Sequence, residues 1–177
     1  MGSFIVLLRA IGPVTHKVMS MAQWRDAAAA DGFVDPQTYV ATGNMIVEAD
    51  DTAANVALRM DRILADLGLS PRNKAVVRTP RQMLDIVTAD PFPQASKERP
   101  TQLAVYFFAE SRPDFGWVSI HRGPEAIKIV GEHLVVEYPI GISASLAGQI
   151  EKRSGLVTAR NWNTVRGLLA RAAARNS

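Results

Sequence analysis

Three short segments of the chain are rich in arginine, asparagine, glycine and hydroxyl side chains. They cover residues 7–11, 38–44 and 158–165. Arginine suits carboxylate or phosphate because its planar guanidinium donates two parallel hydrogen bonds, and hydroxyl and amide groups can complete such a site. The segments lack an acid and base pair, so their chemistry favours binding of an anion over catalysis. The residues that we predict to hold the ligand are Arg9, Thr42, Gly43, Asn44, Arg160 and Asn161.

The segment at residues 158–165 has two interpretations. Asn161 is a favourable capping residue for a helix. The free N–H groups of a helix start attract anions, and Arg160 lies beside them in the chain. In the other interpretation Asn161 only caps the helix, Trp162 anchors it in the core, and Arg160 bonds backbone carbonyls or an acidic neighbour. Arg9 has the same two interpretations, because an arginine at a strand end often pairs with a surface acid.

Other kinds of reactive site are not indicated. The chain has no cysteine, and the histidines at His16, His121 and His133 lack the spacing of a metal-binding motif. The glycine-rich phosphate loops of nucleotide-binding domains and the Gly-x-Ser-x-Gly motif are missing as well. We therefore expect no metal and no cofactor. The alternative to a binding protein is an enzyme that acts on a phosphorylated or carboxylated small molecule, with Glu137 or His16 as its base. A protein-interaction module is a third alternative.

The elements that must position these residues begin with a ferredoxin-like pattern. Short apolar or β-branched runs predict strands at residues 4–8, 38–40, 45–47 and 75–78. Amphipathic spacing predicts one helix after Ser20 and a longer one after residues 51–52, each ended by a glycine. The order β-α-β-β-α-β is that of an antiparallel ferredoxin-like sheet, which we assign to residues 1–89. Residues 41–44 form its hairpin connection, where a Gly-Asn pair suits a tight turn.

A smaller α+β lobe is expected over residues 95–177. Prolines and charged residues at 90–100 predict the boundary. Further strands are predicted at residues 103–108, 127–130 and 134–138, with helices from about residue 143 and from about residue 161. We expect the two lobes to form one compact unit that holds an anionic ligand, either a nucleotide-like metabolite or a nucleic-acid phosphate, in the cleft between them.

The three polar segments, in this order and spacing, resemble the bacterial family catalogued as domain of unknown function 1697. That family has a Leu-Leu-Arg-Gly-Ile-Asn segment, a Thr-Tyr…Ser-Gly-Asn hairpin and an Arg-Asn-Trp-Asn-Thr-Val segment. The likeness also includes Arg78, Pro91-Phe92 and Tyr138-Pro139. It implies a ferredoxin-like N-terminal lobe with a smaller α+β lobe, and no established activity, substrate or cofactor. The family's glycine-rich loop is here an expected loop at residues 10–17 that contains Ala10 and Pro13. Since proline removes an N–H donor, an anion-binding role for this loop is weakened.

The net charge of +3 is concentrated at the C-terminal end, where the last 28 residues carry +5 and the first 149 carry −2. A basic face of the last helix, formed by Arg166, Arg171 and Arg175, is the alternative site for nucleic-acid phosphates, although such arginines more often form a solvated face. Base stacking is disfavoured, because Phe4 is the only aromatic residue on the two expected central strands. With 47% hydrophobic residues and no apolar run near the roughly 20 residues of a membrane span, we expect a globular cytoplasmic protein with no membrane partner.

Overall fold

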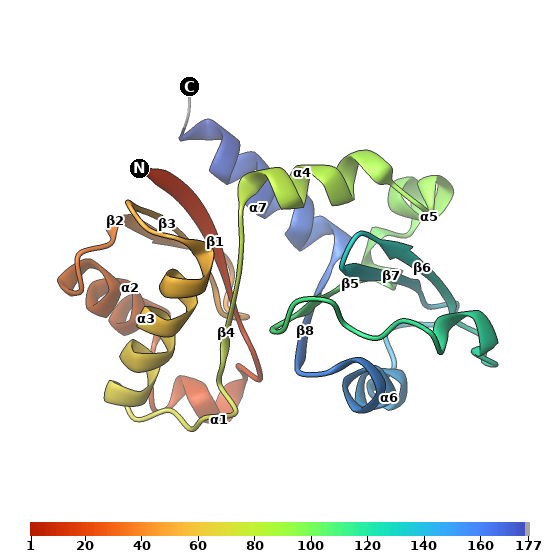
Figure 1. The fold of residues 1–177 in the computed structure, drawn as a ribbon, viewed down its shortest axis with the longest axis horizontal. Coiled ribbons are helices and arrows are strands. Elements are labelled where there is room, and N and C mark those ends of the chain that lie inside the picture. The colour runs from red at the N-terminus through yellow and green to blue at the C-terminus, as the bar shows by residue number, and fades with distance from the viewer. Residues whose placement is uncertain (176–177) are drawn as a thin grey trace. The chain divides into compact units, whose positions relative to one another are not determined.

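The structure is a computed structural model that describes residues 1–175, in which two compact units are distinguished. The first unit consists of Met1–Met83 together with the chain from Leu168 onward, and the second is Leu84–Gly167. Residues 1–175 contain two four-stranded antiparallel sheets and seven α-helices (Figure 1). The expected α+β class is confirmed.

The first unit is built on an antiparallel sheet with the strand order β2-β3-β1-β4. Its strands are β1 (Gly2–Leu8), β2 (Val34–Thr38), β3 (Asn44–Ala49) and β4 (Ala75–Arg78). Its helices are α1 (Pro13–His16), α2 (Met21–Ala30) and α3 (Ala53–Asp66). The predicted helices after Ser20 and Thr52 are confirmed, because both side chains accept a hydrogen bond from a backbone N–H of the first turn.

Helices α2 and α3 supply the apolar core on one face of this sheet. Trp24 of α2 and Met60 of α3 are fully buried with Val6 of β1 and Met45 of β3. The four buried residues of α3, Val56, Met60, Ile63 and Leu64, belong to the apolar stripe that the sequence predicts, whereas its last member, Leu67, follows the helix and is half-buried. Burial of this stripe, worth roughly 1.5–3 kcal/mol for each large side chain, fixes α3 on the sheet.

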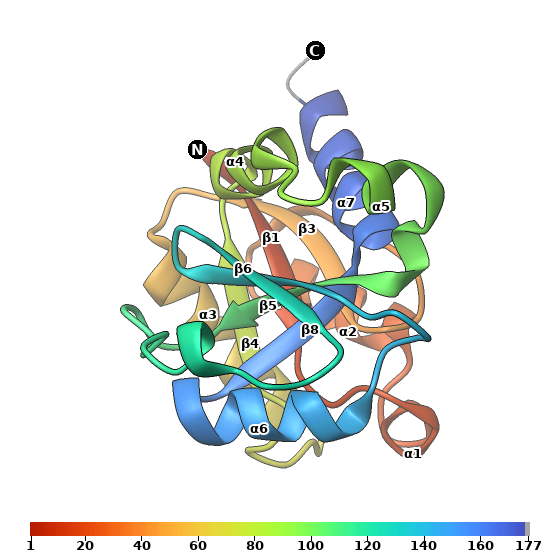
Figure 2. The same ribbon diagram turned by 90° about the vertical axis from the view of Figure 1, so that its right-hand side faces the viewer.

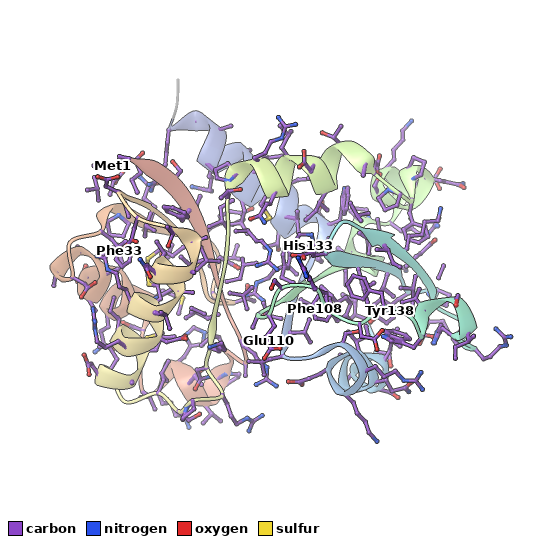
Figure 3. All side chains as sticks on the ribbon, viewed as in Figure 1. Met1, Phe33, Phe108, Glu110, His133 and Tyr138 are labelled. Carbon is purple, nitrogen blue, oxygen red and sulfur yellow. The ribbon has the colours of Figure 1, made fainter. Side chains whose placement is uncertain are left out.

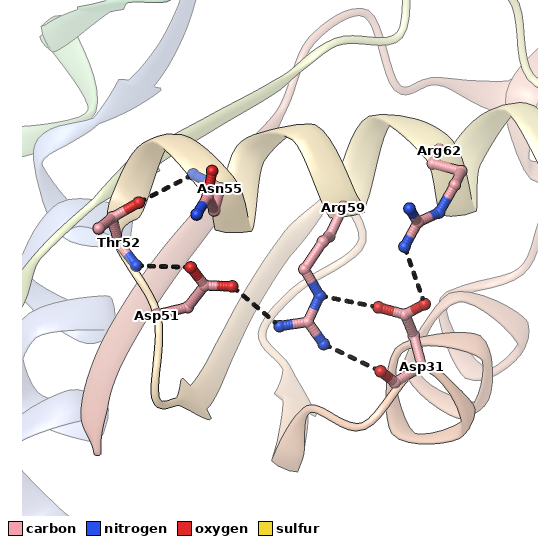
Figure 4. A network of polar contacts seen from close by, with 6 residues as sticks. All are labelled: Asp31, Asp51, Thr52, Asn55, Arg59 and Arg62. Carbon is pink, nitrogen blue, oxygen red and sulfur yellow. Dashed lines mark hydrogen bonds and ion pairs between the residues drawn. The ribbon is translucent and has the colours of Figure 1, made fainter.

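A polar network joins α3 to the end of α2 and to the loop after β3 (Figure 4). Arg59 of α3 donates through Nε to Asp31 Oδ2 at 3.0 Å and through Nη1 to Asp51 Oδ2 at 3.3 Å. Its guanidinium also lies 3.9 Å from the centroid of the Phe33 ring. One arginine side chain therefore connects three segments of the first unit.

The second unit contains an antiparallel sheet with the order β6-β7-β5-β8. Its strands are β5 (Leu103–Phe108), β6 (Ala126–Val130), β7 (His133–Glu137) and β8 (Val157–Asn161). Helices α5 (Pro93–Glu98) and α6 (Ala144–Ser154) belong to it, and α6 packs beside the sheet in Figure 2. Its core includes Tyr106, Phe108 and Tyr138 from the strands and their ends, and Leu146 and Ile150 from α6. Phe108 and Tyr138 are labelled in Figure 3.

The division between the units falls inside two helices, α4 (Pro80–Ala89) and α7 (Trp162–Ala174). Within the first unit, the Arg171 guanidinium lies 4.6 Å from the Tyr39 ring centroid, and Arg175 donates to the backbone oxygen of Asp35. The expected lobe limits of 1–89 and 95–177 stay a prediction.

Several local expectations differ from the structure. The loop expected at residues 10–17 contains the short helix α1, and the boundary expected at 90–100 contains α5. Strand β2 ends at Thr38, which is the first residue of the strand expected at residues 38–40. Asn44 lies in β3 instead of in the hairpin turn. The segment before the last helix is the edge strand β8, since it pairs along its whole length with β5. No helix among residues 1–175 has the length and apolar character that crossing a membrane requires.

Candidate functional site

The turn between β2 and β3, together with the first residue of β3, holds three of the predicted ligand residues, Thr42, Gly43 and Asn44. Asn44 is fully buried, and its Nδ2 donates to Tyr39 O at 3.0 Å and to Thr42 Oγ1 at 2.9 Å. Gly43 has φ of +86°. The amide of Asn44 and the hydroxyl of Thr42 are thus engaged in fixing the turn.

This turn packs against the segment that follows β1, so the structure brings Arg9 near it. Leu8 N donates to Gly43 O at 2.8 Å, and His16 Nε2 donates to Ala41 O at 2.8 Å. A Cβ on residue 43 would lie 2.8 Å from Ile11 Cγ1. Glycine is therefore required both by the positive φ and by close packing.

Arg9 is anchored on a third loop of the first unit. Its Nη1 donates to Arg72 O at 3.1 Å, and its own carbonyl accepts from Asn73 Nδ2 at 3.2 Å. Arg9, Thr42 and Gly43 thus lie in adjoining loops at one end of the first sheet, where Asn44 begins β3. The contacts of these groups connect the loops to one another.

Arg160 and Asn161 lie in the second unit, at the junction of β8 and α7. Asn161 Oδ1 accepts a hydrogen bond from Thr164 N at 2.9 Å, which confirms that Asn161 caps the helix. Arg160 Nη1 donates to Thr158 Oγ1 at 2.7 Å and to Ala159 O at 2.8 Å. The Arg160 side chain is buried, and burial lowers the pKa of its guanidinium to about 10. Since these two residues belong to a different unit from Arg9 and Asn44, a shared site for the six stays a prediction.

The alternative arginines of the last helix have separate contacts. Arg166 Nη2 donates to Asn163 Oδ1 at 3.4 Å, while Arg171 stacks on Tyr39. The Arg175 side chain is only 7% exposed and lies 3.7 Å from Asp35 Oδ2, which differs from the solvated position expected for it. The three arginines thus differ in their contacts, and a nucleic-acid site on this helix stays a prediction.

The histidines are dispersed over the fold. His133 is buried and meets Phe107 edge-on at 5.3 Å (Figure 3). His121 Nε2 lies 3.2 Å from Glu125 Oε2. Within residues 1–175, no three metal-ligating side chains come together in a group that could hold a metal ion.

The second unit contains a pocket that sequence reasoning missed. It has a volume of about 320 Å³ and is lined by residues 91–95 together with Arg99, Lys128 and Glu137. We call it the Phe92 pocket, after the aromatic residue in its wall. Residues 91–95 lead into α5, while Lys128 lies on β6 and Glu137 on β7.

Charged groups of both signs meet in the Phe92 pocket. Arg99 Nη2 donates to Glu137 Oε1 at 2.7 Å. Lys128 Nζ donates to Pro91 O at 2.9 Å and lies 4.8 Å from the Phe92 ring centroid. Two cations, one carboxylate and one aromatic ring therefore line a single opening. In the sequence, Pro91, Phe92 and Arg99 belong to the stretch expected to form the lobe boundary, Pro91-Phe92 also belongs to the resemblance, and Glu137 is a candidate base.

A second pocket, of about 260 Å³, lies in the first unit between α3 and the loop before β4. Its charged groups are paired, because Lys74 Nζ lies 3.1 Å from Asp61 Oδ2, and Asp61 Oδ1 accepts from Ala75 N at 2.8 Å. These contacts join α3 to β4. The Phe92 pocket is thus the stronger candidate for a ligand.

The comparisons with known proteins agree with the architecture. The conserved bacterial protein SP0830 from Streptococcus pneumoniae has a similar fold, with a TM-score of 0.73 at 14% sequence identity, over 98% of this chain and 99% of that one. Comparison with curated proteins returned no match. The family described as "Protein of unknown function (DUF1697)" matches residues 1–134, which confirms the resemblance and includes the polar segments at residues 7–11 and 38–44, whereas the segment at residues 158–165 lies outside the match. The chain therefore belongs to the DUF1697 family.

Proposed function

We propose that this protein binds an anionic small molecule and that the Phe92 pocket receives it. The observation that carries the proposal is the convergence of Arg99 and Lys128 on one opening beside an aromatic ring. Pockets for small ligands typically combine apolar walls with a few convergent polar groups. The proposal includes the expected cytoplasmic location.

The two cations have hydrogen-bonding capacity for a ligand. A guanidinium has five N–H donors and an ammonium has three. The Arg99 side chain is 40% exposed, so a ligand can reach it from solvent. Lys128 is exposed and is held in place by Pro91 O and the Phe92 ring. Since exposed charges are screened by water and salt, we expect modest affinity.

Binding is favoured over catalysis at this pocket. Glu137, the candidate base, accepts a hydrogen bond from Arg99 at 2.7 Å, so one oxygen of its carboxylate is already engaged in an ion pair. A positioned carboxylate of this kind orients the arginine. The enzyme alternative thus has weaker support than the binding protein.

The six residues predicted from the sequence are a second part of the proposal. Arg9 and Arg160 have the side-chain chemistry for an anion, but their contacts to Arg72 O and Thr158 Oγ1 serve the fold. We also propose that the first unit is ferredoxin-like, which its strand order β2-β3-β1-β4 and its helices α2 and α3 support.

The proposal is tested by titrating the protein with phosphate and with succinate at low ionic strength, followed by NMR chemical shifts and calorimetry. We expect binding that weakens about tenfold in Lys128→Gln and in Arg99→Gln, since each removes a charge-assisted hydrogen bond. Lys152→Gln, which removes an exposed lysine from α6, is the matched control and should bind as the wild type does. If neither anion binds, or if both variants bind as the wild type does, the Phe92 pocket is not the site.

Arg9→Gln separates the two parts of the proposal. A loss of anion binding in this variant, with Lys128→Gln unaffected, would move the site to the loops of the first unit. Unchanged binding in Arg9→Gln is the result expected if the Phe92 pocket alone receives the anion.

A further inference from the structure

We infer that the Phe92 pocket selects ligands that carry a protonated amine beside the anionic group, as an α-amino acid does. This inference rests on the proposed function, because it names the ligand class of the same pocket. It is carried by the position of one carboxylate, that of Glu137, among the two cations.

The Glu137 carboxylate can accept a further hydrogen bond beside the one that it accepts from Arg99. Arg99 bonds Glu137 through Oε1, and a carboxylate has about four lone-pair positions on its two oxygens. The Glu137 side chain is 26% exposed, so a ligand can reach the carboxylate. A ligand with only negative charge would approach this carboxylate unfavourably, whereas an ammonium group would turn the same contact into an attraction.

The strand register sets the separation of the opposite charges. Lys128 of β6 lies opposite Val135 of β7, and Glu137 lies two residues further along β7 on the same face. Diagonal neighbours of this kind are about 7–8 Å apart. Lys128 Nζ donates a hydrogen bond to Pro91 O, and Glu137 Oε1 accepts one from Arg99. The cation and the carboxylate thus face the pocket as two separate charges that a dipolar ligand can bridge.

The size of the pocket agrees with a ligand of this class. Its volume of about 320 Å³ is at the lower end of the range of roughly 300–1,000 Å³ for small-molecule sites. That space suits a molecule the size of an amino acid better than a complete nucleotide. The Phe92 ring and its neighbouring prolines offer an apolar surface for the ligand's side chain.

The test uses two pairs of probes that differ only by the amine: propionate with alanine, and ethyl phosphate with phosphoethanolamine. Binding to the wild-type protein is measured by NMR titration at constant ionic strength and neutral pH. We expect each zwitterion to bind about fivefold more tightly than its amine-free partner, which is the size of effect that a partly exposed ion pair produces. Ethylamine alone should bind more weakly than either zwitterion.

Glu137→Gln should abolish the preference for the zwitterion while anions still bind, and Glu110→Gln, which removes an exposed carboxylate after β5, should retain it. If amine-free anions bind as tightly as zwitterions to the wild type, the inference is overturned and the proposed function stands. If no anion and no zwitterion binds, both fail. The comparison on the wild-type protein does not depend on the folding of either variant.

Discussion

At the scale of single residues, the polar groups that first suggest a ligand site have structural contacts. Asn44 donates to both Tyr39 O and Thr42 Oγ1 from a fully buried position, and Asn161 caps α7 through Thr164 N. A buried amide without such partners would cost roughly 1–3 kcal/mol. The amides are therefore explained by the fold, and a ligand is not needed to account for them.

Gly43→Ala is expected to lower the free energy of unfolding by about 2–4 kcal/mol. A residue with a Cβ is sterically strained at the φ of +86° that residue 43 adopts. The added atom would also lie 2.8 Å from Ile11 Cγ1 and 2.9 Å from Leu8 Cβ. Gly131→Ala is the control, since its φ is +60° and a Cβ there meets nothing within 4 Å. Chemical denaturation should give a loss of only about 1 kcal/mol for this control. Equal losses would mean that close packing at residue 43 adds nothing.

At the scale of elements, the segments that the sequence predicted well are those whose burial pattern is local. The stripe of α3 and the apolar runs of β1 and β5 show their period in the sequence itself. Strand β8 is harder to recognise, because its apolar alternation consists only of Val157 and Ala159, and its pairing with β5 joins segments that are about 50 residues apart in the chain. Strand β2 contains Pro36, which sequence rules place at sheet edges, and it is an edge strand here.

The Phe92 pocket could not be predicted for a related reason. Arg99 directly follows α5, Lys128 lies on β6 and Glu137 lies on β7, so the three residues are separated in the chain, and each has an ordinary sequence context. They converge because α5 leads into β5, and β6 and β7 form an antiparallel hairpin beside it. Only the strand register places Lys128 and Glu137 on one face, and a register shift of one residue would separate them.

Removal of the Arg59 guanidinium should destabilise the first unit, because this group joins α3 to the end of α2 and to the loop after β3. Arg59 is 25% exposed and bonds Asp31 and Asp51, so Arg59→Met should lower the free energy of unfolding by about 1–3 kcal/mol. Arg62 also binds Asp31, but its side chain is 62% exposed, and Arg62→Met should cost less than about 0.5 kcal/mol. Thermal and chemical denaturation of both variants measure the difference. Losses of the same size would show that the network of Figure 4 adds no more than a surface ion pair.

At the scale of the whole molecule, the distribution of charge matters more than its sum. The net charge of +3 comes from the C-terminal end, but two of its arginines are engaged with residues of the first unit, Arg171 on the Tyr39 ring and Arg175 on Asp35. Such contacts reduce the number of cations available to a polyanion. A high isoelectric point is thus a weak argument for nucleic-acid binding in this protein, and a small anion agrees better with its charged pocket.

Alkaline pH should lower the stability of the molecule through two buried phenols. Tyr106 and Tyr138 hydrogen-bond each other in the core of the second unit, and burial raises the pKa of both hydroxyls above the usual 10.0, with a further contribution from Glu125. Folding then favours the protonated form. The two protonated tyrosines therefore add to the free energy of unfolding in full below pH 10. This stabilisation is lost as the pH rises above 10, because the tyrosines of the unfolded chain ionise while those of the folded protein do not.

The pH dependence of the melting temperature between about pH 8 and pH 11 measures this effect, with reversible unfolding checked at each pH. The wild type should lose stability above pH 10, and Tyr138→Phe should lose less over the same interval, because one of the two ionising groups is gone. Tyr39→Phe is the control, since that ring lies on the first unit against Arg171 and outside the buried pair. An identical alkaline slope for Tyr138→Phe and the wild type would contradict the assignment of this effect to the tyrosine pair.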